Sequence, residues 1–303
     1  MLLKCLRLSY HQRVTEIVPD TFACFIPEKP APQFRFALEG PGHSASTAMI
    51  ASIKAKCSPE ELLEQMREVE GDAMRVEVFT QSLLFLGHKS FSHSFAAIAK
   101  FHPVFKALAD TEENQILVLR SVFELWRSHQ QMLVVLCDKL LKTGIVECAA
   151  VANWVFSKDM VPEFSKCYIW EIVHITIRKM NKHVAKLSKE ATEARRMIED
   201  SESESSDSDE EGGGGGGGGK RGRRPRPLER PTEESVEKLE ERLEAAQADQ
   251  KNLFLIIFQR FVYNSLSMES FVYIRFIMIL SEHLVRCDTD AVDFKNPWYV
   301  FLC

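Results

Sequence analysis

The fold class of this chain is decided by residues 111–144, TEENQILVLRSVFELWRSHQQMLVVLCDKLLKTG. Apolar residues such as Ile116, Leu119 and Phe123 recur three and four positions apart, the spacing that places side chains on one face of a helix. The stretch holds no proline, and its one glycine, Gly144, stands at the end, where a left-handed residue closes a helix. It therefore predicts long helices and disfavours a sheet, whose turns need more glycine and proline.

The same spacing continues from Met74 to Val155. Upstream, Ser58-Pro59-Glu60-Glu61 combines an N-cap serine, a proline at the first helical position and an acid three residues after the cap. Because the breaks are short, helices of about 14 to 20 residues must pack antiparallel to their neighbours. The predicted fold is all-α, an α-solenoid of antiparallel helical hairpins. The further stripes are Val76, Phe79, Leu83 and Leu86; Phe95, Ile98, Phe101, Phe105 and Leu108; and Val151, Trp154 and Val155.

Two later segments show strict alternation of spacings three and four, which is typical of a coiled-coil seam. At about 1.5 Å per residue the two seams are ~27 Å and ~31 Å long, so they can pair as an antiparallel hairpin. Charged residues flank both seams, as expected for helices with wet outer faces. We expect a coiled-coil arm projecting from the solenoid. The seam residues are Met180, Val184, Leu187, Ala191, Ala194, Ile198, Val236, Leu239, Leu243, Ala246, Leu253 and Ile257, with Gln250 at one further seam position.

The tip of the predicted hairpin, residues 200–232, cannot form a core. Nine of the 14 glycines lie between Gly212 and Gly222, which predicts a flexible linker. Three serines before the glycines, Ser201, Ser206 and Ser208, each have an acid three residues on and are candidate sites for acidophilic kinases. The alternative is an unmodified, solvated spacer.

A basic run follows the glycines. Its basic residues are Lys220, Arg221, Arg223, Arg224 and Arg226. The run is a candidate nuclear-import or nucleic-acid motif, and the alternative is that the preceding acidic block neutralises it.

Composition and charge limit the classes of function that the chain can have. The chain has 303 residues, 45% of them hydrophobic, which is enough for one large domain or two small ones. The net charge of −5 is a sum of opposed blocks, acidic at 199–211 and basic at 220–230, so the remainder is nearly neutral. This balance argues against a broad phosphate-binding surface and leaves a local patch open. The eight cysteines form no close pair, and several lie on apolar helical faces, namely Cys137, Cys148 and Cys167, which indicates reduced, mostly buried thiols in a cytosolic or nuclear protein.

The sequence offers no catalytic constellation. His88, His93 and His102 lack the spacing of metal ligands, and no nucleophile elbow, phosphate-binding loop or dinucleotide fingerprint is present. The tryptophans lie on apolar helical stripes, so we interpret them as core residues rather than a base-stacking platform. We predict no enzyme activity, no cofactor, no metal and no small-molecule substrate. Three charges interrupt the apolar segment 253–280, which predicts no membrane association.

Specific strings carry a resemblance beyond these patterns. They include LSYHQR at 8–13, KSFSHSF at 89–95, CAAVANWVF at 148–156, TIRKMNKHV at 176–184 and QKNLFLIIFQRF at 250–261. In these strings and their order, the chain resembles the family of large subunits of the nuclear cap-binding complex.

The resemblance implies helical-repeat domains like the middle domain of initiation factor 4G and a non-catalytic scaffold. The family docks a small RRM-type subunit, which binds the 7-methylguanosine cap, so capped RNA is an indirect partner. It further implies RNA-processing, export and decay factors as partners and a location in the nucleus, with shuttling to the cytoplasm left open. The residues that contact the small subunit are not assigned.

On this resemblance the chain divides into successive parts. They are 1–25, the end of the second repeat domain; 26–57, a Pro-rich linker and first helix; 58–168, repeats of the third domain; 169–199, the first arm helix; 200–232, the disordered tip; 233–261, the second arm helix; 262–276, an insert; and 277–303, a truncated terminal helix region. The family lacks the insert and continues beyond the ending, which predicts misjoined coding sequence and poor solubility of this chain alone.

Two other classes of function remain open. A nucleic-acid-binding protein would act through residues 220–226 and lose affinity steeply with salt. A coiled-coil protein would self-associate through the two seams.

Overall fold

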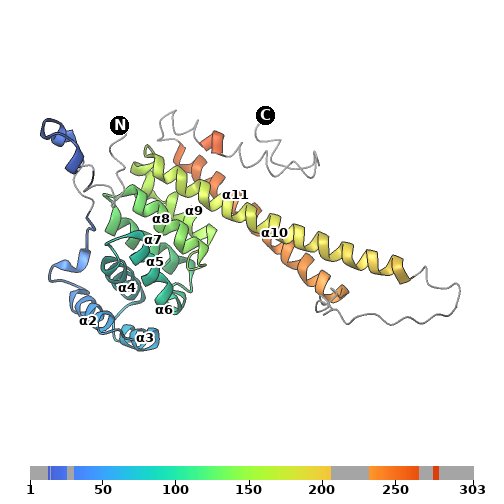
Figure 1. Ribbon diagram of the computed structural model, residues 1–303, viewed down its shortest axis with the longest axis horizontal. Helices are drawn as coiled ribbons and strands as arrows, with labels where there is room; N and C mark the ends of the chain where they lie inside the picture. The colour runs from blue at the N-terminus through green and yellow to red at the C-terminus, as the bar shows by residue number, and fades with distance from the viewer. Residues whose placement is uncertain (1–12, 14, 26–30, 206–231, 266–275, 280–303) are drawn as a thin grey trace, which may run out of the picture. The chain divides into compact units, whose positions relative to one another are not determined.

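The computed structural model describes residues 13, 15–25, 31–205, 232–265 and 276–279. Every regular element in these ranges is a helix (Figure 1), which confirms the all-α prediction. The chain divides into two compact units, which we call the helical body, Met1–Ile177 with Leu255–Cys303, and the paired-helix unit, Arg178–Phe254. Within the described residues, no helix is both long enough and apolar enough to cross a bilayer.

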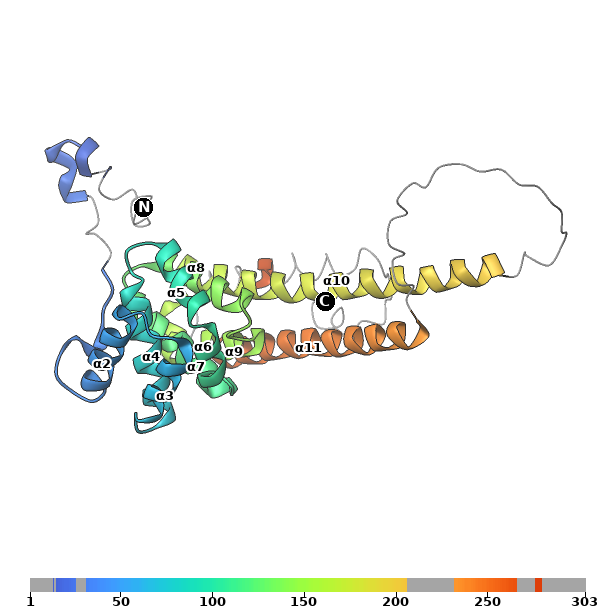
Figure 2. The same ribbon diagram turned by 60° about the horizontal axis from the view of Figure 1, so that its bottom comes forward.

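The helical body is built around α4 and α7, which pack closely together. Helices α8 and α9 cover α7, α2 lies against α4, and α5 contacts both α6 and α8 (Figure 2). The short helices of the body are η2 (Asp20–Phe25), η3 (Arg35–Ala37) and η4 (Lys158–Glu163). The α-helices that lie wholly within the body are α2 (His43–Lys54), α3 (Pro59–Arg67), α4 (Asp72–Leu86), α5 (Phe91–Lys100), α6 (His102–Leu108), α7 (Glu112–Trp126), α8 (Gln130–Lys142) and α9 (Cys148–Val155).

The predicted helix start at Ser58 and the predicted helix end at Gly144 are confirmed, and Thr111 provides a further cap. The Ser58 side chain accepts a hydrogen bond from the Glu61 N–H at 3.1 Å, and the Glu61 carboxylate accepts from the Ser58 N–H at 3.0 Å. This reciprocal pair is a capping box, which satisfies two otherwise unpaired donors at the start of α3. Thr111 caps α7 by accepting from the Asn114 N–H at 3.2 Å. Gly144 has a φ of +70° just after α8, as a closing residue requires.

The predicted single stripe from Phe95 to Leu108 is wrong as one helix, because the structure ends α5 at Lys100 and begins α6 at His102. Pro103 explains the break, since a proline lacks the N–H that a helix interior needs but fits at the first turn of a new helix. The predicted lengths of about 14 to 20 residues hold for α4 and α7 but not for the short α6 and α9.

The predicted core tryptophans are buried, and this interpretation is confirmed. Trp126, Trp154 and Trp170 are at most 3% exposed. Among the described cysteines, Cys137 and Cys148 are buried, as expected, but Cys167 is exposed. Cys167 is the first residue of α10 (Cys167–Ser205), where the helix has only begun to enter the core.

The paired-helix unit consists of the later part of α10 and the earlier part of α11 (Glu233–Ser265), which run side by side in Figure 2. Near one end Gln250 donates to the Asn181 side chain at 2.9 Å, and farther along Arg195 meets Glu240 at 2.7 Å. Because residue numbers rise along one helix while they fall along the other, the pair is antiparallel.

Residues 169–177 and 255–261, which the sequence analysis assigns to the arm, belong to the helical body. Trp170 shows the reason, because its ring centre lies 5.9 Å from that of Phe164 and 6.5 Å from that of Phe261. These segments bury more than one helical face, whereas a coiled-coil seam is a narrow stripe.

Candidate functional site

A strap formed by residues 31–42, which is irregular apart from the short helix η3, contacts α4 and α7 before α2 begins. The Gln33 N–H donates to the Leu125 carbonyl at 2.7 Å, which ties the strap to the end of α7. Phe34 stacks on Phe85 of α4 with ring centres 4.3 Å apart, and Phe36 is only 2% exposed. The strap therefore contributes Phe36 to the core of the helical body, while most of its other residues stay exposed.

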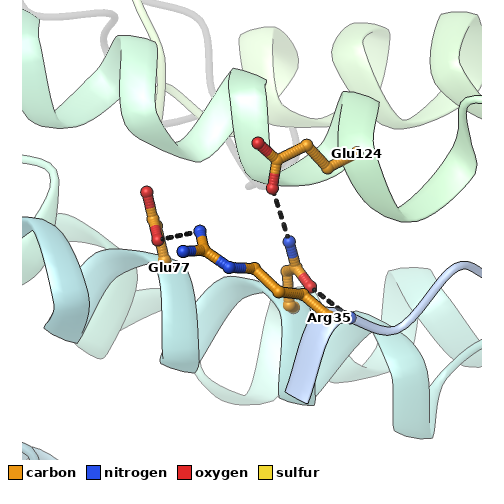
Figure 3. Close-up of polar contacts among 4 residues, drawn as sticks. Arg35, Glu77 and Glu124 are labelled. Atoms are coloured by element: carbon orange, nitrogen blue, oxygen red, sulfur yellow. Dashed lines mark hydrogen bonds and ion pairs between the residues drawn. The ribbon is translucent and has the colours of Figure 1, made fainter. Parts of the chain in front are cut away.

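Polar side chains hold the strap to both central helices (Figure 3). The Arg35 guanidinium contacts the Glu77 carboxylate at 2.7 Å, and the Arg35 N–H donates to the Gln81 side chain at 3.1 Å. Gln81 in turn donates to Glu124 of α7 at 3.0 Å. Gln81 is fully buried on α4, so this chain of contacts satisfies both ends of an amide that would otherwise destabilise the core.

The strap ends at Gly42, which has a φ of +83°. A Cβ at this position would lie 2.7 Å from a ring carbon of Phe36 and 2.9 Å from the Met74 sulfur. Only glycine combines that backbone conformation with that close approach.

Beyond Gly42 lies a groove of about 520 Å³ between α2, α3 and the start of α4. Small and apolar residues, among them Ala45, Ala48 and Val69, line it, and Glu68 and Glu70 stand exposed at its rim. Such a lining suits an apolar side chain flanked by a positive charge. The groove has only one local signal in the sequence, the glycine after Pro41, because its lining comes from three separate helices.

Burial suppresses the ionisation of two groups in the body, the Cys137 thiol and the Tyr168 hydroxyl. Burial raises the pKa of the Cys137 thiol to about 12, so this cysteine stays protonated at neutral pH and is a poor nucleophile. Burial and the hydrogen bond to Glu163 raise the pKa of Tyr168, whose hydroxyl donates to that carboxylate at 2.6 Å. Both groups support packing rather than chemistry.

The three clustered histidines have structural partners. The His88 Nδ1 lies 2.6 Å from the Phe85 carbonyl, His93 contacts the Ser90 hydroxyl at 2.7 Å, and His102 contacts the Thr143 carbonyl at 3.0 Å. Within the described ranges, no group of three His, Cys, Asp or Glu side chains could hold a metal ion.

The structure leaves none of the twelve seam residues exposed. Seven are buried, namely Leu187, Ala191, Ala194, Val236, Ala246, Leu253 and Ile257, and five are half-buried, namely Met180, Val184, Ile198, Leu239 and Leu243. Ile257 belongs to the helical body and the others to the paired-helix unit.

The remaining predicted site residues are not placed. The side chain of Ser201, the serines Ser206 and Ser208, and the basic run 220–226 lie outside the described residues. The same holds for most of the insert 262–276 and of the terminal region 277–303.

Comparison with known proteins gives consistent matches. A family model described as MIF4G like matches residues 34–270. The chain is 51% identical over 324 residues to nuclear cap-binding protein subunit 1 of Aedes aegypti, 50% over 318 residues to that of Anopheles gambiae and 42% over 313 residues to subunit 1-B of Xenopus laevis. These alignments cover 98–99% of this chain but only 36–38% of the relatives' own length.

Proposed function

The chain belongs to the MIF4G-like family, and from this membership we propose that it is a non-catalytic scaffold subunit of a nuclear complex that binds the mRNA cap. The observation that carries the proposal is 51% identity, over 99% of the chain, to a protein named nuclear cap-binding protein subunit 1. A helical body that carries a groove of about 520 Å³ lined by small and apolar residues supports a binding role.

The proposal assigns the cap itself to a second, small subunit of the RRM type. This chain would dock that subunit and present further surfaces to RNA-processing, export and decay factors in the nucleus. The groove beside α2 is a candidate docking surface within the helical body.

Co-purification of the chain with a small RRM-type cap-binding subunit tests the scaffold function, followed by fluorescence anisotropy of capped and uncapped RNA. We expect a stable complex whose affinity for capped RNA exceeds that of the small subunit alone. Failure to associate, with a full-length relative as the positive control, would overturn the proposal.

A pair of variants tests the groove separately. Ala48→Arg places a long charged side chain into the groove, whereas Thr47→Arg adds the same charge at the adjacent exposed position outside its lining. We expect only Ala48→Arg to weaken association with the small subunit. Equal effects would exclude the groove as the docking surface while leaving the scaffold function intact.

The two alternatives have less support. The seam residues of the paired-helix unit are buried or half-buried within one chain, so they do not require a second copy of the chain to cover them. Nucleic-acid binding through residues 220–226 stays a prediction, and replacing the four arginines there with glutamine would abolish it.

A further inference from the structure

One surface of the helical body concentrates positive charge although the body as a whole is nearly neutral. Residues 87–109, which include α5 and α6, hold three lysines and no acid. Helix α8, which lies against α5, adds Lys139 and Lys142 and has one acid, Asp138.

Three contacts bring Lys106 and Lys139 to one corner of the body, where α5, α6 and the end of α8 meet. The Lys139 ammonium lies 5.4 Å from the centre of the Phe95 ring on α5. On α6, His102 contacts the Thr143 carbonyl at 3.0 Å, and the Lys106 ammonium donates to the Gly144 carbonyl at 2.8 Å. The end of α8 is therefore fixed against the α5–α6 corner.

We call Lys106, Lys139 and Lys142 the basic ridge. Lys106 and Lys142 are exposed, and Lys139 is half-buried over its aromatic partner. Asp138 contacts Lys142 at 2.6 Å and offsets part of its charge, which leaves the ridge clearly positive.

Lys100 is not part of the ridge, although it lies on α5. Its ammonium lies over the Phe101 ring, 4.8 Å from the ring centre, rather than beside the end of α8.

The chemistry of the ridge favours phosphates over carboxylates. Helices α5, α6 and α8 contain no arginine, the residue whose planar fork grips a carboxylate with two hydrogen bonds. A lysine ammonium is a compact point charge that can donate to a phosphate oxygen in many orientations. The half-buried Phe95 ring lies beside Lys139, and the half-buried Phe91 precedes it by one turn of α5, so this helix also offers apolar surface on which bases can stack.

We propose that the basic ridge binds the phosphate backbone of single-stranded RNA without regard to its sequence. The inference rests on the proposed function in one respect: a scaffold held next to the cap lies close to the RNA strand downstream of the cap. The binding itself needs neither the cap nor the small subunit.

The salt dependence of RNA affinity tests the ridge. Each phosphate contact on a single strand contributes about 0.7 to the slope of log K against log salt concentration, so a few lysine contacts give a slope of roughly −2 to −3. The probe is uncapped oligouridylate, and the protein is the full chain with Lys220, Arg221, Arg223, Arg224 and Arg226 replaced by glutamine, so that the basic run makes no contribution.

The decisive variant is Lys139→Gln with Lys142→Gln, because Lys142 is exposed and Lys139 is only half-buried, so a shorter polar side chain fits at both positions. The matched control is Lys54→Gln with Lys158→Gln, which removes the same charge from exposed positions on α2 and η4. We expect the ridge variant to reduce the slope by about 1.4 and the control to leave it nearly unchanged. The variant Lys139→Arg with Lys142→Arg keeps both positive charges and should bind RNA with the slope of the unchanged ridge. Thermal melting checks that each variant folds.

Equal losses in the ridge and control variants would overturn the inference, because the effect would then be net charge alone. Tighter binding of a polyglutamate peptide than of RNA would also overturn it and would indicate an acidic protein partner. Because the measurement omits the cap and the small subunit, its failure leaves the scaffold function standing. Failure of the association test likewise leaves the ridge measurement interpretable.

Discussion

The helical body and the paired-helix unit are built from the same kind of helix but bury it differently. Helix α4 in the body buries eight of its 15 residues, polar Gln81 and Ser82 among them. In the paired-helix unit, only Leu187, Ala191 and Ala194 are fully buried between residues 178 and 200. In a helix enclosed on several sides, buried polar side chains need hydrogen-bond partners inside the core. A helix in a two-helix layer needs only one stripe of apolar residues along the contact. The body should therefore respond to single changes far more strongly than the paired-helix unit.

Removal of a central aromatic ring from the body is the largest test of this difference. Phe79 is fully buried on α4 and packs edge-on against Phe105 with ring centres 4.7 Å apart. We expect Phe79→Ala to lower the free energy of unfolding by about 3–5 kcal/mol, because the enclosed site cannot collapse around the cavity. Urea unfolding followed by tryptophan fluorescence measures this, since Trp126, Trp154 and Trp170 all lie in the body.

Leu187→Ala in the paired-helix unit is the matched control. Leu187 is also buried, but it lies in a layer of two helices that water can enter from both sides. We expect the free energy of unfolding of this unit to fall by about 2 kcal/mol, the lower end of the range for Leu→Ala changes in a core. The fluorescence midpoint, which reports on the body, should hardly shift. Equal shifts for the two variants would contradict the division into units that respond independently.

The strap of the body provides the second test. Gly42→Ala should destabilise the body by about 1–3 kcal/mol, because a left-handed backbone is strained for alanine and its Cβ would meet Phe36. Gly144→Ala shares the positive φ of +70° but has no atom within 4 Å of the added Cβ. Its expected loss is about 1 kcal/mol, the conformational strain alone. Thermal melting of both variants separates crowding from strain, and equal losses would show that Phe36 moves aside.

The pH dependence of body stability provides the third test. Burial lowers the pKa of His129, whose Nδ1 accepts from the Met132 N–H at 3.1 Å and caps α8. The unfolded chain therefore binds more protons than the folded chain once the pH falls below about 6.5, and stability decreases there by at most about 1.4 kcal/mol per pH unit. His129→Asn keeps a capping acceptor without a titrating ring. Melting temperatures between pH 5 and 7 should fall less for this variant, and identical profiles would exclude His129 as the source.

Features set by neighbours in the sequence were predictable. The caps at Ser58 and Thr111 and the closing Gly144 each act within four residues, so the local pattern contains the whole cause. The break at Pro103 was also local, but the unbroken apolar stripe masked it. The exposure of Cys167 depends on where α10 enters the core, which its own spacing does not reveal.

Features that join distant segments were not predictable. Gln33 donates a hydrogen bond to Leu125, and Gln81 donates one to Glu124. The partners in each pair are far apart in the sequence, and no repeat in the sequence links one to the other. The groove and the basic ridge likewise arise from helices that meet only in the fold, since α6 touches the end of α8 through Lys106 and His102. Spacing predicts which face of a helix is apolar, but not which helix covers it.

Two ion pairs give the smallest and sharpest comparison between the units. In the body, Arg35 and Glu77 meet at 2.7 Å with side chains 50% and 15% exposed. In the paired-helix unit, Arg195 and Glu240 meet at the same distance with side chains 62% and 42% exposed. The Coulomb attraction is screened in proportion to exposure, so equal geometry does not mean equal stabilisation.

We expect Glu77→Gln to lower the stability of the body by about 1 kcal/mol at any moderate salt concentration, because the change weakens a partly buried contact that also holds the strap. Glu240→Gln should change stability by only about 0.2–0.5 kcal/mol at low salt, and this effect should vanish in molar salt. Double-mutant cycles with Arg35→Gln and Arg195→Gln isolate each pair from its surroundings. A coupling energy at Arg195 as large and as insensitive to salt as that at Arg35 would show that the paired-helix unit shields its charges as the body does. The contrast in burial between the two units would then not govern their stability.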